Sequence, residues 1–250
     1  KFALRTYKMN LIIDIGNTSA KLAVFQNNKT IISSCIQVSK LVSEIDKLLL
    51  EFSEISQGII SCVGMLQLKD IKLIQKKISL IFLNHDLKLP FKIQYETPKT
   101  LGSDRLALVA AACSQYDSKN VLIIDAGSCI TYDFLDSNKN YLGGAIAPGI
   151  KMRYNSLSHF TSNLPLLSKK ITQNLIGNST NSCIHSGVIK GVLHEIEGAV
   201  SDYQSKYPDL TVILTGGDTD FLCKQLKISI FANSDFLLEG LNFLLETNSN

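Results

Sequence analysis

The chain has 250 residues, of which 45% are hydrophobic and 19% are charged, with 15 Gly and 5 Pro. This length suffices for one or two domains with a buried core, and the composition excludes a disordered, collagen-like or coiled-coil chain. The formal net charge of +3 is too small to indicate a nucleic-acid or membrane partner, which leaves small molecules as the expected ligands.

The first residues predict neither a signal peptide nor a membrane anchor. Basic residues precede an apolar stretch that covers only 11–13, and the chain nowhere holds 18 consecutive apolar residues. Because Met9 stands just before this stretch, we interpret residues 1–8 as a leader or an added extension. The six cysteines form no CxxC pair and no cluster with histidines, which argues against zinc and disulfides and indicates a reducing cytoplasm.

Strands and helices are expected to mix along the chain as in an α/β protein. Apolar runs predict strands at 20–25, 31–38, 58–62, 80–83, 130–135 and 211–214. Helical periodicity predicts helices at 39–52, 68–78, 103–116, 182–203 and 235–246.

Two similar segments indicate an internal duplication. LIIDIGN at 11–17 and LIIDAGS at 122–128 begin 111 residues apart, and each joins a buried strand to a glycine turn and a second strand. The polar stretch at 116–120 lies between them. We therefore expect two α/β lobes with a cleft between them, formed by residues 9–117 and 118–250.

The two repeated strands each end in an aspartate and a glycine turn. Such a turn suits phosphate and a divalent cation, because backbone N–H groups can face phosphate oxygens while the carboxylate holds a hydrated cation. The alternative is an ordinary hairpin whose Asp and Asn side chains satisfy the turn backbone. The second copy at 125–128 favours nucleotide binding, since two such carboxylates can converge on one nucleotide. Lys21 is expected mainly to continue the second strand.

The segment LGSDR at 101–105 opens a predicted helix. Asp104 can be the helix cap, or Ser103 can cap the helix and leave Asp104 free. The positive helix N-terminus favours an anionic group, and Arg105 can add a two-pronged contact to a carboxylate or phosphate. Spacing alone leaves these readings open.

The glycine-rich segment at 141–149, which contains GGAIAPG at 143–149, predicts a loop that approaches a ligand or another part of the backbone closely, with a plain turn as the alternative. LTGGD at 214–218 ends a strand in two glycines and can border adenosine in a kinase, with a simple strand–helix link as the alternative. The chain has no P-loop, GxGxxG, GxSxG or HExxH motif, and its four histidines are scattered.

Taken in order, the segments resemble type III pantothenate kinases, and together they cover nearly the whole chain from Met9. Each motif is weak alone, but the ordered set is specific. The motifs that carry the resemblance are DIGNT at 14–18, Tyr95, Pro98, LGSDR at 101–105, DAGSCIT at 125–131, GGAIAPG at 143–149, Met152, LP at 164–165, GNSTNSCIHSG at 177–187 and LTGGD at 214–218.

This resemblance implies two duplicated ribonuclease H-like domains of the actin-like and sugar-kinase superfamily. It also implies a cytoplasmic homodimer that transfers the γ-phosphoryl group of ATP to the primary hydroxyl of pantothenate, the first step of coenzyme A synthesis. Mg²⁺ with ATP and a monovalent cation, potassium or ammonium, are the implied cofactors, with no nucleic-acid or membrane partner.

The resemblance also implies roles for individual residues. Asp104 would be the general base, Asp125 would bind the monovalent cation, and Asp14 is a candidate ligand for Mg²⁺. The implied pantothenate-binding residues are Tyr95, Gly102, Ser103, Asp104, Arg105 and, plausibly across the dimer interface, Thr180. The implied ATP-binding residues are Asp14, Ile15, Gly16, Asn17, Thr18, Ser19, Ala20, Lys21 and Ser128. Ser128 stands where the family usually has Thr, and it keeps the hydroxyl.

Two other functions are compatible with these patterns. One is another small-molecule kinase of the same superfamily, which should lack LGSDR at this place. The other is a nucleotide-binding regulator without turnover, although no helix-turn-helix pattern or basic stripe indicates DNA contact. Retention of Asp14, Asp104 and Asp125 favours catalysis, because a binding protein has little need of Asp104.

Overall fold

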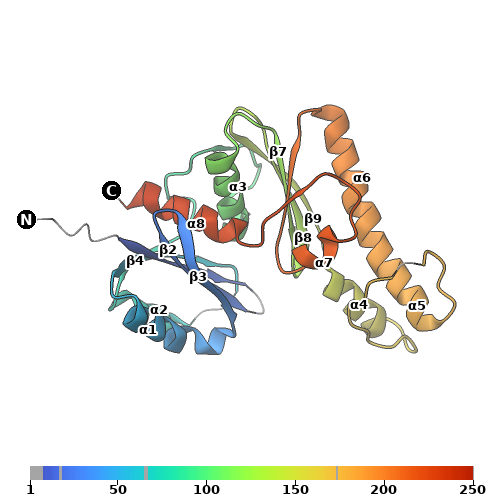
Figure 1. Ribbon diagram of the computed structural model, residues 1–250, viewed down its shortest axis with the longest axis horizontal. Helices are drawn as coiled ribbons and strands as arrows, with labels where there is room; N and C mark the ends of the chain where they lie inside the picture. Colours follow the sequence, from blue (N-terminus) through green and yellow to red (C-terminus); the bar gives the residue numbers. More distant parts are fainter. Residues whose placement is uncertain (1–7, 17–18, 65–66, 173, 250) are drawn as a thin grey trace, which may run out of the picture. The chain divides into compact units, whose positions relative to one another are not determined.

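The computed structural model describes residues 8–16, 19–64, 67–172 and 174–249, and the chain divides into two compact units (Figure 1). The first unit runs to Gln115 and resumes at Phe236, and the second spans Tyr116–Asp235. The first boundary lies close to the one expected after residue 117. The C-terminus differs from the expectation, because the last helix belongs to the first unit.

The first unit is built on a five-stranded sheet with the order β3-β2-β1-β4-β5. The first three strands form an antiparallel meander, while β4 runs parallel to β1 and β5 parallel to β4. The strands are β1 (Met9–Ile15), β2 (Ala20–Gln26), β3 (Lys29–Ile36), β4 (Ile55–Cys62) and β5 (Ser79–Phe82), and the short β6 (Lys92–Ile93) follows.

Helices lie on both faces of this sheet. Helices α1 (Leu41–Glu51) and α2 (Leu68–Gln75) cover one face, where their apolar side chains join a core with alternate residues of β1 and β2. Helices α3 (Ser103–Gln115) and α8 (Phe236–Asn248) pack against each other on the other face (Figure 1). Two short 3₁₀ turns, Val38–Lys40 and Pro98–Thr100, complete this unit.

The sequence of α8 explains why it joins the first unit. Its apolar residues are buried beside the alanine-rich α3, and its one fully interior polar residue, Asn242, meets a matching set of amides. The Asn10 side chain on β1 donates to Asn242 at 2.7 Å, and Gln57 on β4 donates to Asn10 at 2.7 Å. Asn242 in turn donates to Asn28 at 2.9 Å. Buried amides need such partners, so the network ties α8 to this sheet.

The second unit repeats the same topology. Its strands follow the order β11-β10-β7-β8-β9, with β7, β8 and β9 antiparallel, β10 parallel to β7 and β11 parallel to β10. The strands are β7 (Val121–Ala126), β8 (Cys129–Leu135), β9 (Asn140–Pro148), β10 (Thr211–Thr215) and β11 (Phe231–Ala232). The helices are α4 (Ile150–His159), α5 (Thr180–His185), a π-helical stretch (Ser186–Lys190), α6 (Gly191–Lys206) and α7 (Thr219–Cys223). Side chains of these helices form one core with alternate residues of β7 and β8.

The repeat extends to the register of the strands. Asp14 is the next-to-last residue of β1 and pairs with Lys21 on β2 and Ser61 on β4. Asp125 is the next-to-last residue of β7 and pairs with Thr131 on β8 and Thr215 on β10. The two aspartates therefore occupy equivalent positions, which confirms the predicted duplication.

One predicted loop is wrong. Residues 143–149 were expected to form a glycine-rich turn, whereas the structure places most of them in the nine-residue strand β9, paired with β8. Glycine allows β9 to approach β8, because a Cβ at Gly144 would overlap the carbonyl oxygen of Tyr132. Close approach to another backbone was predicted correctly, but it occurs within a sheet.

No helix within the described ranges is both long and apolar enough to span a membrane.

Candidate active site

A buried carboxyl group lies at the end of β1 in the first unit. Parallel pairing of β1 with β4 places Asp14 beside Ser61, and side chains of paired residues lie on the same face of a sheet. Ser61 is fully buried. Among the described residues, the Oδ1 atom of Asp14 has no hydrogen-bond partner although it is buried. An acidic oxygen of this kind fits an oxygen-preferring cation such as Mg²⁺.

The surroundings of Asp14 raise its pKa to about 6. Burial is the largest cause, because it penalises the charged form, and the nearby Asp104 carboxylate adds to it. A hydrogen bond from Ser61 and the positive charge of Lys21 act in the opposite direction. Burial and the charge of Asp14 also raise the pKa of the Cys62 thiol. The Asp104 carboxylate is thus close enough to act on Asp14.

The first turn of α3 supplies the neighbouring groups. The Ser103 hydroxyl lies 3.1 Å from the Ser61 hydroxyl, and the Asp104 carboxylate accepts the Arg105 backbone N–H at 2.8 Å. Ser103 and Asp104 are the first two residues of the helix, so neither is its N-cap. The buried Arg105 guanidinium lies over the Tyr95 ring, 5.8 Å from its centroid. The structure therefore brings these predicted residues together.

The turn after β1 contains the other predicted residues of the first phosphate loop. The Gly16 N–H donates to the Ser19 carbonyl at 3.0 Å, which closes the turn. Ile15 and Ala20 are fully buried in the core, so only their backbone can face a ligand. Lys21 lies in β2, as its strand pattern predicted. Asn17 and Thr18 lie outside the described residues.

In the second unit, a carboxylate and two tight turns converge at the ends of β7 and β10. Gly216 follows β10 with φ +96°, and a Cβ there would overlap the Oδ1 atom of Asp125 and the Ala126 carbonyl. The Asp218 N–H donates to the same carbonyl at 2.9 Å. Glycine therefore lets the backbone after β10 pass close to Asp125, so that a carboxylate and a backbone carbonyl lie together at this turn.

The turn between β7 and β8 is equally tight. The Gly127 N–H donates to the Cys129 carbonyl at 2.8 Å, and Ser128 at the tip is exposed. The Gly149 N–H donates to the Ser128 carbonyl at 3.2 Å. A Cβ at Gly149 would overlap the carbonyl oxygens of Gly127 and Ser128, so only glycine fits there.

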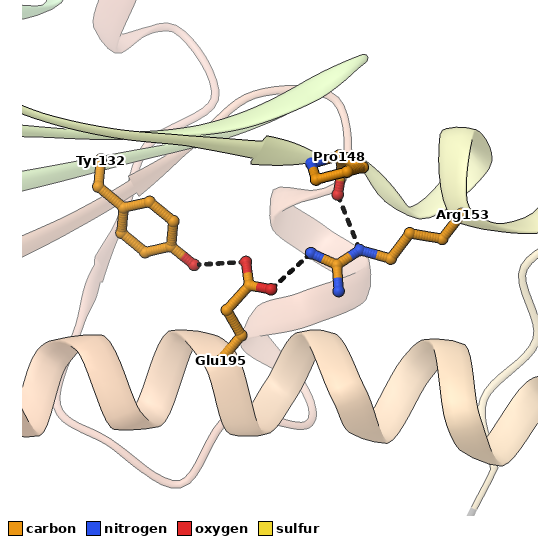
Figure 2. A network of polar contacts seen from close by, with 4 residues as sticks. All are labelled: Tyr132, Pro148, Arg153 and Glu195. Carbon is orange, nitrogen blue, oxygen red and sulfur yellow. Dashed lines mark hydrogen bonds and ion pairs between the residues drawn. The ribbon is translucent and has the colours of Figure 1, made fainter. Parts of the chain in front are cut away.

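Three side chains, those of Tyr132, Arg153 and Glu195, form a hydrogen-bonded clamp on the Pro148 carbonyl, next to Gly149 (Figure 2). Arg153 on α4 donates from Nε to the Pro148 carbonyl at 2.8 Å and from its terminal nitrogen to Glu195 on α6 at 2.7 Å. The Tyr132 hydroxyl on β8 donates to Glu195 at 3.2 Å. Burial, and then the neighbouring Glu195 carboxylate, raise the pKa of Tyr132, so this hydroxyl stays a donor. The clamp fixes the end of β9 against the turn at Ser128.

Thr180 lies in the second unit as the first residue of α5, and its side chain is exposed. Ser179 and Ser182 cap this helix reciprocally. Thr180 is therefore free of any capping role.

Sequence reasoning missed Ser61 and the Arg153 clamp. A polar residue near the end of the apolar run at 58–62 was a signal for Ser61, because polar side chains at the carboxyl ends of parallel strands often face a ligand. No comparable signal marked Arg153 and Glu195, which are 42 residues apart.

A family model described as type III pantothenate kinase matches residues 10–202. The chain belongs to this family. A type III pantothenate kinase from Christiangramia forsetii is 51% identical to it over 240 residues, which cover 96% of this chain and 99% of the relative.

Two solved structures resemble this member of the type III pantothenate kinase family in fold. A Campylobacter jejuni protein assigned to the Baf family of transcriptional activators aligns with a TM-score of 0.66 at 24% identity, over 96% of this chain and 99% of that one. A Listeria monocytogenes protein assigned as an N-acetylmannosamine kinase aligns with a TM-score of 0.54 at 14% identity, over 95% and 99%. These identities bear on the fold alone. The fold is the predicted one of duplicated ribonuclease H-like domains.

Proposed function

We propose that this protein transfers the γ-phosphoryl group of ATP to the primary hydroxyl of pantothenate. Family membership supports the reaction, and the observation that carries it to this chain is the contact of Ser61 with Ser103, which brings the α3 turn with Asp104 towards Asp14 at one end of the first sheet. Phosphoryl transfer needs positioning and charge neutralisation together with a group that receives the proton of the attacking hydroxyl. These residues can supply both.

Asp104 is the proposed general base. Its carboxylate stands on the first turn of α3, beside Ser103 and above the buried Arg105, whose planar guanidinium suits a carboxylate such as that of pantothenate. Tyr95 covers the same guanidinium and would line the acceptor pocket. Asp14 would hold the magnesium ion that accompanies ATP, and this ion neutralises phosphate charge when bound.

The turns of the second unit are the proposed second phosphate site. Ser128 would contact ATP from the exposed tip between β7 and β8, and Asp125 would bind potassium or ammonium. The Asp125 carboxylate and the Ala126 carbonyl, which the backbone at Gly216 approaches closely, are oxygen groups that suit such a cation, and they support this assignment. Replacing Asp125 with Ala should flatten the response to potassium, and a normal response in that variant would place the cation elsewhere.

ADP release with ATP, Mg²⁺ and pantothenate, compared in potassium and sodium, tests the reaction. Turnover should require pantothenate and should be faster in potassium. If ADP release does not depend on pantothenate in either salt, the proposed reaction is wrong, and a regulator or a kinase for another acceptor takes its place.

The Asp104→Asn variant tests the base. Its kcat should fall about 10²- to 10⁴-fold, the usual contribution of a positioned base, while ATP still binds. Asp70→Asn is a matched control, because Asp70 also lies in the first turn of a helix of the same unit, α2. Near-normal turnover of Asp104→Asn would remove this residue from the role of base.

We also propose a homodimer in which Thr180 contacts pantothenate bound by the partner. Large apolar side chains exposed in the second unit, including Phe160 and Ile176, support an association surface there. Mixing Asp104→Asn with Thr180→Ala chains tests it. Heterodimers would regain one intact site, giving about a quarter of the wild-type sites. No recovery after subunit exchange would place Thr180 in its own chain's site or outside any site.

A further inference from the structure

The Ser61 hydroxyl lies between two groups of the proposed site. It is fully buried near the end of β4, beside Asp14 on β1, and its oxygen is 3.1 Å from the Ser103 oxygen on α3. The Asp14 carboxyl group is its neighbour across the β1–β4 pair, on the same face of the sheet, and Ser61 acts to lower the pKa of that group. It therefore links the strand that carries Asp14 to the helix turn that carries Asp104.

The number of protons available among Asp14, Ser61 and Ser103 determines which group donates each hydrogen bond. A serine hydroxyl has one proton to donate, and an ionised carboxylate only accepts. When Ser61 donates to the Asp14 carboxylate, the contact between the serines requires Ser103 to donate to Ser61. The Ser103 oxygen then has only lone pairs left for a ligand.

We propose that Ser61 is a positioning residue for phosphoryl transfer, which fixes Ser103 as a hydrogen-bond acceptor for a hydroxyl or amide N–H of the acceptor substrate. This inference rests on the proposed function. Ser61 does not touch the substrate itself, since its side chain is fully buried. It acts through Ser103 and through the placement of the α3 turn relative to Asp14.

The fold itself does not require this hydroxyl. Backbone pairing holds β4 between β1 and β5, and the preceding residue on the same face, Ile59, is apolar and fully buried. A small apolar residue at position 61 would satisfy the core, whereas a buried hydroxyl is unfavourable unless it is bonded. The presence of serine is explained by its two polar neighbours, Asp14 and Ser103.

Ser61→Thr and Ser61→Val form a matched pair, because the two side chains have nearly the same shape and differ in the hydroxyl. Removing one hydrogen bond to a charged group should lower kcat/KM for pantothenate about 10- to 30-fold in Ser61→Val. Ser61→Thr should stay within about threefold of the wild-type enzyme, because it keeps the hydroxyl. Equal losses in Thr and Val variants of equal thermal stability would overturn the proposal.

A double-mutant cycle with Ser61→Ala and Ser103→Ala needs no extra space in the core. If Ser61 acts through Ser103, the double variant should be no more than about twofold worse than the more damaging single variant. If the losses in kcat/KM multiply, the two serines act independently and the inference fails. A wild-type enzyme without pantothenate-dependent turnover would instead refute the proposed function, so the two failures are distinguishable.

Discussion

The two halves of the chain place an aspartate at the same point of the same sheet but surround it differently. Asp14 lies beside Lys21 and Ser61, with one buried oxygen unpartnered among the described residues and a pKa raised to about 6. Asp125 lies beside Thr131 and Thr215, and the backbone at Gly216 approaches its carboxylate closely.

This difference teaches how one duplicated fold can serve two tasks. The common strand register determines where the carboxylates stand, and the residues next to them determine their properties. The first half concentrates acidic and hydroxyl side chains, as acid–base chemistry requires. The second half presents backbone groups in tight turns, which suit the oxygens of a phosphate chain.

The largest expected contrast is in the tolerance to a methyl group of Gly149, which follows β9, and Gly16 in the first turn. Gly149→Ala should destabilise the second unit by about 3 kcal/mol, because the new Cβ would overlap two backbone carbonyl oxygens. Gly16→Ala should change stability by less than about 1 kcal/mol, since its Cβ would lie 3.4 Å from the Ser19 carbonyl, an ordinary contact.

Thermal unfolding of the two variants measures this contrast. The midpoint of Gly149→Ala should fall by about 6–12 °C, and that of Gly16→Ala should stay within about 3 °C of the wild type. Similar shifts in both would show that the backbone at Gly149 is no more constrained than the backbone at Gly16.

The next effect concerns the buried carboxylate of the first half. Asp14→Asn should abolish most activity yet raise stability at neutral pH by about 1–3 kcal/mol. Because the pKa of Asp14 is raised from 3.8 to about 6, the folded state favours its protonated form. Wild-type stability from this group is present below pH about 4 and is lost as the pH rises through about 6.

Urea unfolding without ATP and Mg²⁺ checks this sign. The stability difference between Asp14→Asn and the wild type should grow between pH 4 and pH 7.5 and then level off. Asp70→Asn is the control on the same unit. A difference that does not change with pH would show that the Asp14 charge is not unfavourable in the fold.

The smallest effect is expected at the clamp of the second half. Tyr132→Phe removes one donor to Glu195, while Arg153 still pairs with that carboxylate. Chemical denaturation should show a loss of about 1 kcal/mol, the usual net value of one hydrogen bond. A loss above about 3 kcal/mol would mean that Tyr132 holds the turn at Ser128 more strongly than Arg153 does.

Local signals in the chain predicted most strands and the duplication. The repeated LIIDIGN and LIIDAGS segments form β1 and β7 with matched aspartates, because a buried strand followed by a tight turn is encoded by neighbouring residues. LGSDR opens α3 as expected.

The missed features depend on residues far apart in the chain. Strand β9 was read as a loop because its glycines lack strand propensity, and pairing with β8 overrides that preference. Ser61 is 42 residues from Ser103, and Asn10 is 232 residues from Asn242, so only the folded chain brings them together. For the same reason the sequence assigned α8 to the wrong half.

The position of α8 also governs the order of events during synthesis. The second unit is continuous, so all of its residues are synthesised before α8. The Asn10 amide of the first unit gains its partner Asn242 only when α8 docks, and until then α3 alone covers that face of the sheet. Proteins generally fold from the N-terminus as they emerge. In this chain the half that starts first is finished last, and its exposed sheet is the part that a chaperone would protect.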